Sequence, residues 1–264
     1  MLHKGVVQGF IRMCNDGWLA GWHERNGGNA TCRLIEGELE LNTPQTDWRP
    51  IGVTATNLAG QFFITTGTGK YFRNIAQNPA ENIGVVEISP CGSMWRTVWG
   101  LENGALPTSE FPSHILNHSV RMEVTQGRDR VIYHAHPTAL IALTFVLPPE
   151  DRAITKALWS AITECAVVFP EGVGALPWMV CGGEEIAQAS CDKMKTYSAV
   201  AWAHHGLFCS GPDFDATFGL MHTIEKAADI HLRAMQCGIR QSITDDNLRE
   251  LARAYGVQLN EGLL

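Results

Sequence analysis

Apolar residues near the start of the chain repeat at helical spacing and predict a long helix with one buried face. The repeat falls every four residues, at Val6, Phe10, Cys14, Trp18 and Trp22. A stripe with this period faces a protein core along one side of a helix. We therefore expect a helix over residues 4–22, followed by a glycine-rich turn at 25–29.

Short apolar runs that end at glycine, proline or polar residues predict strands, and longer amphipathic runs predict further helices. The expected strands cover residues 30–34, 62–65, 83–88, 94–99, 131–136, 166–169 and 199–203. The expected helices cover residues 138–145, 152–159, 184–197, 216–236 and 244–255. Residues 36–60 carry the weakest pattern, and we expect only short strands and loops there.

Strands and helices alternate along the chain without a linker, an internal repeat or a low-complexity segment. The turn sequence Ser89-Pro90-Cys91-Gly92 joins two of the expected strands into an antiparallel hairpin. A chain of 264 residues can bury a large core. We expect an α/β protein with one domain over residues 1–264 and a largely antiparallel sheet.

Composition and charge exclude several classes of protein. A formal net charge of −7 argues against a nucleic-acid or anionic-membrane partner. The longest apolar run, residues 139–147, is too short to cross a bilayer, and the first residues lack the layout of a signal peptide. Eight scattered cysteines without a Cys-x-x-Cys pair indicate reduced thiols, so we expect a cytoplasmic protein.

Two histidines alternate at the end of an expected strand, in Val131-Ile132-Tyr133-His134-Ala135-His136-Pro137. Side chains two positions apart in a strand point the same way, with Cα atoms about 6.6 Å apart. Two such imidazoles can bind one transition metal, although surface histidines also alternate by chance. The pair His204-His205, before Gly206 at another strand end, is the natural source of a third ligand. The pattern alone does not choose between His204 and His205.

Two glycine-rich segments can either bind an anion or simply turn the chain. They are Arg25-Asn26-Gly27-Gly28-Asn29 and Thr66-Gly67-Thr68-Gly69-Lys70. Glycines and hydroxyls after a strand can surround a phosphate with backbone N–H groups. The spacing of a nucleotide-binding P-loop is absent, so the second segment fits a phosphate monoester better than a nucleotide.

The segment Thr108-Ser109-Glu110-Phe111-Pro112 predicts the start of another helix. Thr108 or Ser109 is a suitable N-cap, and Pro112 suits the first turn. Glu110 would lie in that turn, where the helix dipole stabilises a carboxylate. Taken alone, this glutamate needs no role beyond capping.

The sequence resembles the bacterial class II, zinc-dependent aldolases nearly end to end, as far as Gly256. The segments that carry the resemblance are Glu24-Arg25-Asn26-Gly27-Gly28-Asn29, Thr66-Gly67-Thr68-Gly69-Lys70, Pro107-Thr108-Ser109-Glu110, His134-Ala135-His136, Thr163-Glu164-Cys165, Phe169-Pro170, Leu176-Pro177-Trp178-Met179-Val180 and His205-Gly206. The histidine motifs occur across the wider aldolase and epimerase family, and the Asn-Gly-Gly-Asn and Pro-Thr-Ser-Glu motifs are more specific.

The resemblance implies a three-layer αβα fold with a largely antiparallel central sheet flanked by helices. It implies one Zn²⁺ per subunit, held by His134, His136 and His205, because the third ligand of the family directly precedes a glycine. It implies that Glu110 is the catalytic carboxylate. The residues implied to hold the phosphate and the ketose backbone are Asn26, Gly28, Asn29, Thr68, Gly69, Thr108 and Ser109.

The implied activity is that of a lyase in rhamnose breakdown, which reversibly cleaves L-rhamnulose 1-phosphate into dihydroxyacetone phosphate and L-lactaldehyde. Zinc would act as a Lewis acid, and Glu110 would move the C3 proton. The resemblance also implies a homotetramer with active sites near subunit boundaries. Glu164 is then a candidate proton donor to the aldehyde oxygen in a neighbouring subunit, and an ordinary solvated glutamate is the alternative.

Other interpretations stay open at this point. L-fuculose 1-phosphate or a 5-deoxypentulose phosphate would suit the same catalytic residues, and a pentulose-phosphate 4-epimerase would use the same three histidines with further acid/base residues. A non-catalytic metal-binding or sugar-phosphate-sensing protein would not need Glu110. Two departures from the family also matter, because residues 36–60 match poorly and His204 replaces a more familiar aromatic residue.

Overall fold

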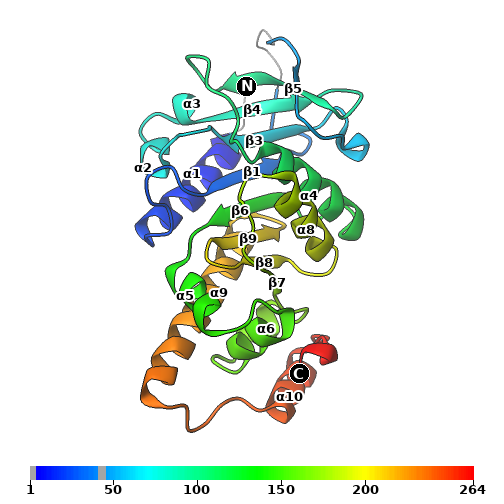
Figure 1. Ribbon diagram of the computed structural model, residues 1–264. Coiled ribbons are helices and arrows are strands. Elements are labelled where there is room, and N and C mark those ends of the chain that lie inside the picture. Colours follow the sequence, from blue (N-terminus) through cyan, green and yellow to red (C-terminus); the bar gives the residue numbers. More distant parts are fainter. Residues whose placement is uncertain (1–3, 41–45) are drawn as a thin grey trace.

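The computed structural model describes residues 4–40 and 46–264, and within them nine strands form one sheet (Figure 1). The strands are β1 Asn29–Arg33, β2 Arg49–Pro50, β3 Phe62–Thr66, β4 Ile83–Ile88, β5 Met94–Gly100, β6 Val131–Ala135, β7 Gly174–Leu176, β8 Ala199–Trp202 and β9 Gly206–Gly211. Their order across the sheet is β2-β5-β4-β3-β1-β6-β9-β8-β7.

Every neighbouring pair of strands is antiparallel except β7 with β8. The expected hairpin is present, because β4 pairs with β5 and the turn between them closes with a hydrogen bond from Gly92 N–H to Ser89 O. The prediction of a largely antiparallel sheet is confirmed.

Helices of very different lengths connect the strands. They are α1 Lys4–Leu19, α2 Phe72–Ile75, α3 Pro79–Asn82, α4 Phe111–Val124, α5 Thr138–Val146, α6 Asp151–Trp159, α7 Cys165–Val168, α8 Glu184–Met194, α9 Phe214–Cys237 and α10 Asp245–Tyr255, with short 3₁₀ turns at Thr56–Leu58 and Glu261–Leu263. None of the described helices is both long enough and apolar enough to span a membrane.

The helices cover both faces of the sheet and make three layers, with α1, α5 and α9 on one face and α4 and α8 on the other (Figure 1). Alternation along β6 sorts its side chains between the two faces. Val131 and Tyr133 join the core beneath α1 and α9, whereas Ile132 joins the core beneath α8. His134 and His136 alternate with Tyr133 and therefore belong to the α4 and α8 face.

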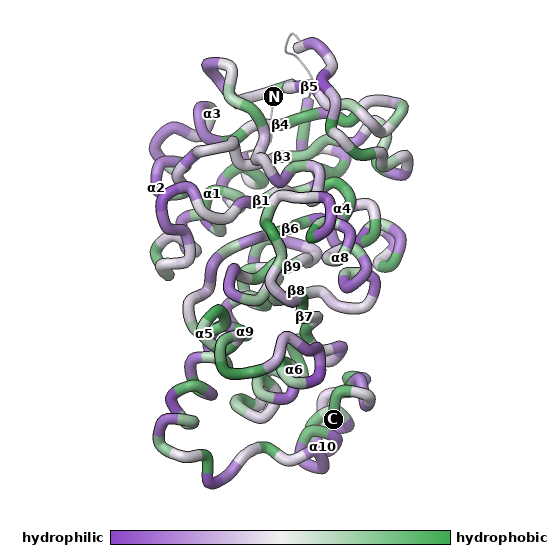
Figure 2. The backbone as a smooth tube through the Cα atoms, in the orientation of Figure 1, coloured by the Kyte–Doolittle hydropathy of each residue, from purple (hydrophilic) through white to green (hydrophobic). Residues whose placement is uncertain are grey.

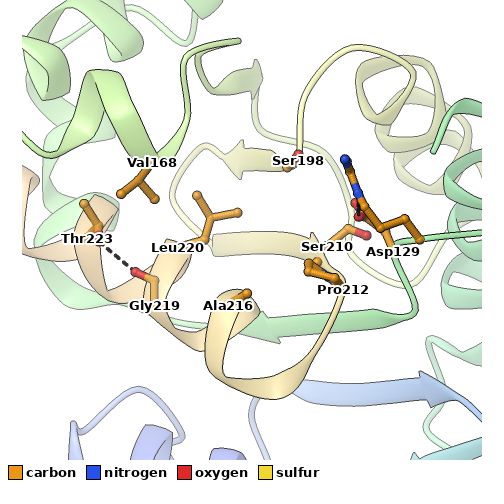
Figure 3. Close-up of a pocket in the computed structure, with 11 residues that line it drawn as sticks. Asp129, Val168, Ser198, Ser210, Pro212, Ala216, Gly219, Leu220 and Thr223 are labelled. Atoms are coloured by element: carbon orange, nitrogen blue, oxygen red, sulfur yellow. Dashed lines mark hydrogen bonds and ion pairs between the residues drawn. The ribbon is translucent and has the colours of Figure 1, made fainter. Parts of the chain in front are cut away.

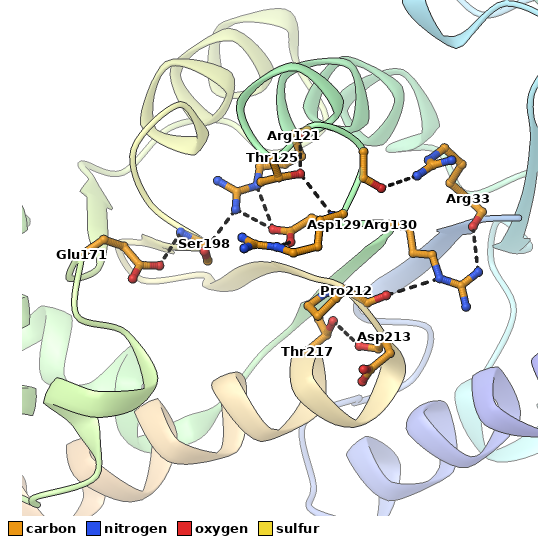
Figure 4. Close-up of polar contacts among 12 residues, drawn as sticks. Arg33, Arg121, Thr125, Asp129, Arg130, Glu171, Ser198, Pro212, Asp213 and Thr217 are labelled. Atoms are coloured by element: carbon orange, nitrogen blue, oxygen red, sulfur yellow. Dashed lines mark hydrogen bonds and ion pairs between the residues drawn. The ribbon is translucent and has the colours of Figure 1, made fainter. Parts of the chain in front are cut away.

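A buried ion pair fastens α4 to the start of β6 (Figure 4). Arg121 of α4 donates from Nη2 to Asp129 Oδ2 at 2.5 Å, and both side chains are almost completely buried. Arg121 Nη1 also donates to the Met194 carbonyl at the end of α8, at 2.9 Å. Because Asp129 lies two positions before the first residue of β6, these bonds set α4 and α8 relative to the strand that carries His134.

The apolar run 166–169 is the clearest error of the sequence prediction, because it forms the short helix α7 where a strand was expected. The N–H groups of Val167 and Val168 both donate to the Glu164 carbonyl, which closes a helical turn. α7 packs against α6, α9 and α10. An apolar run of four residues does not distinguish a buried strand from a buried helical turn.

Smaller differences occur at element ends. The first helix ends at Leu19. Trp18, expected on its buried face, is 39% exposed, whereas Trp22 beyond the helix is buried as expected. α4 begins at Phe111, and Glu110 is its N-cap in place of Thr108 or Ser109. The predictions omit two strands, β7 with only three residues and β9 with a glycine at each end. Part of segment 36–60 lies outside the described residues, and the rest contains β2 and one 3₁₀ turn.

Helix α5 is hydrophobic along nearly its whole length (Figure 2). Its inner residues Leu140 and Leu143 are fully buried, yet Phe145 and Val146 at its end are exposed. Trp178 and Val180, after β7, are also exposed. These large apolar side chains are therefore not covered within one chain.

Candidate metal centre and active site

Three histidines from two neighbouring strands meet at one end of the sheet. His134 lies in β6, His136 follows this strand, and His205 directly precedes β9. The pairing of Ala135 with Leu207 brings the two strand ends together. The Nε2 atoms of His134 and His205 are 3.3 Å apart, and one ring nitrogen of each histidine lies within 4.8 Å of the others.

Hydrogen bonds orient two of these rings so that nitrogen lone pairs face a common point. His134 Nδ1 donates to the Leu207 carbonyl at 3.0 Å, which leaves the lone pair on Nε2. His136 Nδ1 lies 2.6 Å from Oε1 of Glu24, and its buried Nε2 has no hydrogen-bond partner among the described residues. The second-sphere carboxylate on His136 is the arrangement that orients metal-binding histidines.

The electrostatics of the cluster keep His134 and His205 unprotonated. Burial is the main cause that lowers the pKa of His134 well below its ordinary value and the pKa of His205 to about 4. Nearby His136 lowers the pKa of both rings further. Neutral imidazoles with convergent lone pairs fit a divalent transition metal, so this group can hold one.

His204 is directed away from this cluster. Its φ of 61° turns the chain, and its backbone N–H donates to Thr144 Oγ1 at 2.9 Å. The exposed ring contacts Phe145, with centroids 4.2 Å apart. Of the two candidate third ligands, the structure thus brings only His205 to His134 and His136.

Glu110 lies beside the histidines at the N-cap of α4. Asn29 pairs directly with His134 across β1 and β6, and Asn29 Nδ2 donates to Glu110 Oε2 at 2.8 Å. Burial raises the pKa of Glu110, while the Asn29 hydrogen bond and the nearby His136 oppose this rise. A buried carboxylate with a raised pKa next to a metal-binding group is suited to proton transfer.

The loops that were expected to bind phosphate converge beside the start of α4. Thr66 Oγ1 accepts a hydrogen bond from Ala30 N–H at 3.2 Å, and Thr66 O accepts one from Thr108 N–H at 2.8 Å. Thr68 N–H donates to the Leu106 carbonyl at 2.9 Å. These bonds join the ends of β1 and β3 to the loop that precedes Glu110.

The expected phosphate-binding residues differ in their exposure. Asn26, Thr68, Gly69 and Ser109 are exposed, Gly28 is half-buried, and Asn29 and Thr108 are buried. Gly28 and Gly69 have φ values of 76° and 67°, which glycine adopts without strain. The amide of Asn29 is already bonded to Glu110, so this side chain serves the carboxylate in the structure.

His23 supports the first glycine-rich loop and is absent from the candidates that the sequence supplies. Its Nε2 lies 2.6 Å from the hydroxyl of Tyr133, and its Nδ1 lies 3.0 Å from the Gly27 carbonyl. Burial lowers the pKa of His23 to about 3. The neutral ring accepts from Tyr133 and donates to Gly27. No spacing in the sequence indicates this contact, because His23 simply follows the first helix.

Glu164 is not part of this cluster within one chain. It is exposed at the start of α7, and its side chain makes no hydrogen bond or ion pair with the three histidines in the described part of the chain. A cavity of about 530 Å³ that borders α9 is also separate (Figure 3). It lies at Gly211, at the opposite end of β9 from His205, and is lined by Asp129, Ser210 and Leu220 among others.

The sequence as a whole matches that of known enzymes. The profile of the Class II Aldolase and Adducin N-terminal domain matches residues 8–232. The rhamnulose-1-phosphate aldolase of Klebsiella pneumoniae subsp. pneumoniae is 47% identical over 257 residues, which are 96% of this chain and 93% of that protein. The rhamnulose-1-phosphate aldolase of Mannheimia succiniciproducens is 44% identical over 269 residues, covering 100% of this chain and 99% of that protein.

Solved structures share the same fold at lower sequence identity. A sugar-phosphate aldolase from Thermotoga maritima has a TM-score of 0.77 and 23% identity, covering 90% of this chain and 98% of that chain. An L-fuculose 1-phosphate aldolase has a TM-score of 0.64 and 19% identity, and the match covers 97% of this chain and 98% of that chain. The three-layer αβα class with a mostly antiparallel sheet is therefore confirmed.

Proposed function

The chain belongs to the class II aldolase and adducin family, and from this premise we propose that it is a zinc-dependent aldolase of L-rhamnulose 1-phosphate. The reaction is the reversible cleavage of this substrate into dihydroxyacetone phosphate and L-lactaldehyde. Relatives that are 44–47% identical over nearly the whole chain carry this name. The observation that carries the proposal is the convergence of His134, His136 and His205 beside Glu110.

Zinc is the metal that we propose for the histidine cluster, with one ion per subunit. A tetrahedral zinc with Zn–N bonds of about 2.0–2.1 Å separates two ligand nitrogens by about 3.3 Å. The Nε2 atoms of His134 and His205 have this separation, 3.3 Å. Three histidines, with no further ligand grouped with them among residues 4–40 and 46–264, leave a position for substrate, as in catalytic zinc sites.

The chain's own residues divide the chemistry between them. When bound, zinc supplies a Lewis acid that stabilises negative charge on the carbonyl and hydroxyl oxygens of the substrate. Glu110 removes the proton from the carbon that becomes C3 in the condensation direction and returns it in the cleavage direction. Burial moves the pKa of Glu110 towards neutral pH, and a general base transfers protons most effectively when its pKa lies near the working pH.

The converging loops are proposed to bind the phosphate and the ketose backbone. The residues assigned to this role are Asn26, Gly28, Asn29, Thr68, Gly69, Thr108 and Ser109. Backbone N–H groups, amides and hydroxyls are donors that hold a phosphate without adding charge to the site. Exposed Asn26, Thr68 and Ser109 are accessible to a ligand, which supports the assignment.

We extend the proposal to a cytoplasmic homotetramer of single-domain subunits, each formed by residues 1–264. The exposed apolar side chains of Phe145, Val146, Trp178 and Val180 support contact with a second copy of the chain. In this assembly Glu164 donates a proton to the aldehyde oxygen in the neighbouring active site. Its exposure on α7, away from the histidines of its own chain, fits a role across a subunit boundary.

A substrate comparison tests the proposed function. The purified protein is incubated separately with L-rhamnulose 1-phosphate, L-fuculose 1-phosphate and a 5-deoxypentulose phosphate, and dihydroxyacetone phosphate is measured. We expect the highest kcat/KM with L-rhamnulose 1-phosphate, abolished by a zinc chelator and restored by added zinc. A higher kcat/KM with another ketose 1-phosphate would contradict the substrate, and activity unaffected by chelation would contradict the zinc mechanism.

A further inference from the structure

Behind Glu110 a chain of hydrogen-bonded side chains runs from the active site into the core between β1 and α4. Asn29 Oδ1 is hydrogen-bonded to His114 Nε2, and His114 Nδ1 lies 2.7 Å from Thr31 Oγ1. The same hydroxyl of Thr31 lies 2.8 Å from His118 Nε2. Asn29 and Thr31 lie on one face of β1, and His114 and His118 are one helical turn apart on α4.

The direction of each hydrogen bond follows from the carboxylate. An ionised Glu110 only accepts, so the NH₂ group of Asn29 faces it and Oδ1 of Asn29 accepts from His114 Nε2–H. His114 Nδ1 is then unprotonated and accepts from the Thr31 hydroxyl. With its only hydrogen used, Thr31 Oγ1 accepts from His118 Nε2–H. Every bond therefore donates towards Glu110.

The side chains of this hydrogen-bonded row are buried more deeply than a purely structural contact requires. Thr31 and His114 are fully buried, and His118 is 2% exposed. Apolar residues would fill this space without the cost of removing imidazoles from water. Burial lowers the pKa of His114 to about 3, so the ring stays neutral and keeps one donor and one acceptor. Bonds aligned in one direction in a buried region polarise and strengthen each other.

We propose that Thr31 and His114 are positioning residues that act through Asn29 to hold Glu110 for transfer of the C3 proton. This inference rests on the proposed aldolase function. The bond from Asn29 occupies Oε2, and no described residue bonds to Oε1 of Glu110, which leaves Oε1 for the substrate proton. His114 fixes the amide plane of Asn29, Thr31 fixes the tautomer of His114, and the carboxylate is thereby held in one orientation.

Thr31→Val tests the row of hydrogen bonds with little change in shape, because valine replaces the hydroxyl by a methyl group. We expect the variant to keep its zinc content, its melting temperature and its KM. Its kcat and its rate of proton exchange from dihydroxyacetone phosphate into solvent should both fall by about 10-fold to 100-fold, the cost of a misplaced catalytic group. Thr31→Ser, which restores the hydroxyl, should have near-wild-type kcat and exchange.

Thr65→Val provides a matched control. Thr65 lies directly opposite Thr31 in the pairing of β1 with β3, is equally buried, and donates its hydroxyl only to the Thr66 carbonyl. It should retain wild-type kcat and exchange. His114→Gln against His114→Leu repeats the comparison one bond closer to Glu110, and the glutamine, which can donate to Asn29, should retain more exchange than the leucine.

Two results would overturn the inference. One is a Thr31→Val enzyme with wild-type proton exchange, and the other is an equal loss in Thr31→Val and Thr65→Val. Neither result affects the proposed function, because both are measured against an active wild-type enzyme. Conversely, a wild-type protein that cleaves no ketose 1-phosphate contradicts the proposed function directly.

Discussion

The Nε2 atoms of His134 and His205 lie 3.3 Å apart although the two histidines are 71 positions apart in the chain. The antiparallel pairing of β6 with β9 holds them together, so the sheet itself assembles the histidines of the proposed metal centre. The glycine after His205 has a steric reason, because a Cβ at Gly206 would lie 2.3 Å from the Ala135 carbonyl. Since these strands are central in the sheet, we expect the fold to persist without metal.

Replacing any one of His134, His136 and His205 by alanine should lower zinc content and aldolase activity together, because two histidines bind zinc much more weakly than three. His204→Ala should have a milder effect, because its ring contacts Phe145 outside the cluster. Metal analysis and steady-state kinetics on the same preparations check this. Loss of zinc in His204→Ala with retention in His205→Ala would reverse the ligand assignment.

Glu110→Gln should separate metal binding from proton transfer. Zinc content should stay at the wild-type value because the three histidines are unchanged. Turnover and proton exchange from dihydroxyacetone phosphate should fall by about 10²–10⁴-fold, the usual cost of a lost general acid/base group. If Glu110 only caps α4, the substitution would lower the melting temperature and leave exchange near the wild-type rate. Measuring exchange, zinc and melting temperature on one sample decides between these roles.

The proximity of His134 and His136 was predictable because it depends on a local rule. Alternation along a strand placed His134 and His136 on one face, and the structure agrees. The choice of His205 needed the resemblance, because two adjacent histidines at a strand end differ only in how the turn directs them. The φ of 61° at His204, which sends its ring outward, has no signature in the sequence.

The support of the site was much harder to predict. The bond between Thr31 and His114 joins residues 83 positions apart, and it depends on how α4 packs on β1. The only local signal is the spacing of His114 and His118, which places two histidines on one face of a helix. The prediction of a strand at residues 166–169 was wrong for a related reason, because packing against α9 and α10 decides between a strand and a helical turn.

Acid should destabilise the metal-free protein through its buried neutral histidines. Burial lowers the pKa of His114 from 6.5 to about 3, so between these values the unfolded chain binds the proton and the folded chain does not. Stability is therefore lost as the pH falls below 6.5, by about 2 kcal/mol per such histidine between pH 7 and pH 5. In urea unfolding of the apo-protein, His114→Gln should reduce this loss by about 2 kcal/mol. An unchanged pH dependence would contradict a neutral buried His114.

Gly28→Ala should damage both stability and activity, because it combines two independent costs. The φ of 76° is unfavourable for alanine, and the new Cβ would lie 2.5 Å from His23 Nδ1 and 2.6 Å from the His134 carbonyl. Gly21→Ala is the matched control, since Gly21 has a φ of 80° but no atom within 4 Å of the added Cβ. It should cost only about 1–2 kcal/mol of backbone strain. Equal losses of melting temperature in the two variants would show that the close contacts are unimportant.

Mixed oligomers should reveal whether Glu164 acts in a neighbouring active site. Glu164 is exposed at the start of α7 and has no bond to the histidines of its own chain, so a catalytic role for it would require a second subunit. Glu164→Gln alone should lower kcat while zinc content and oligomer mass, measured by light scattering, stay unchanged.

The variants Glu110→Gln and Glu164→Gln are each defective when assembled alone. After they are dissociated, mixed and reassembled, some active sites combine an intact Glu110 from one subunit with an intact Glu164 from the next. Activity should therefore rise above that of either parent. Glu164→Gln with wild-type turnover would remove this residue from the mechanism. A defective Glu164→Gln enzyme that gains no activity on mixing would instead place its action within a single subunit.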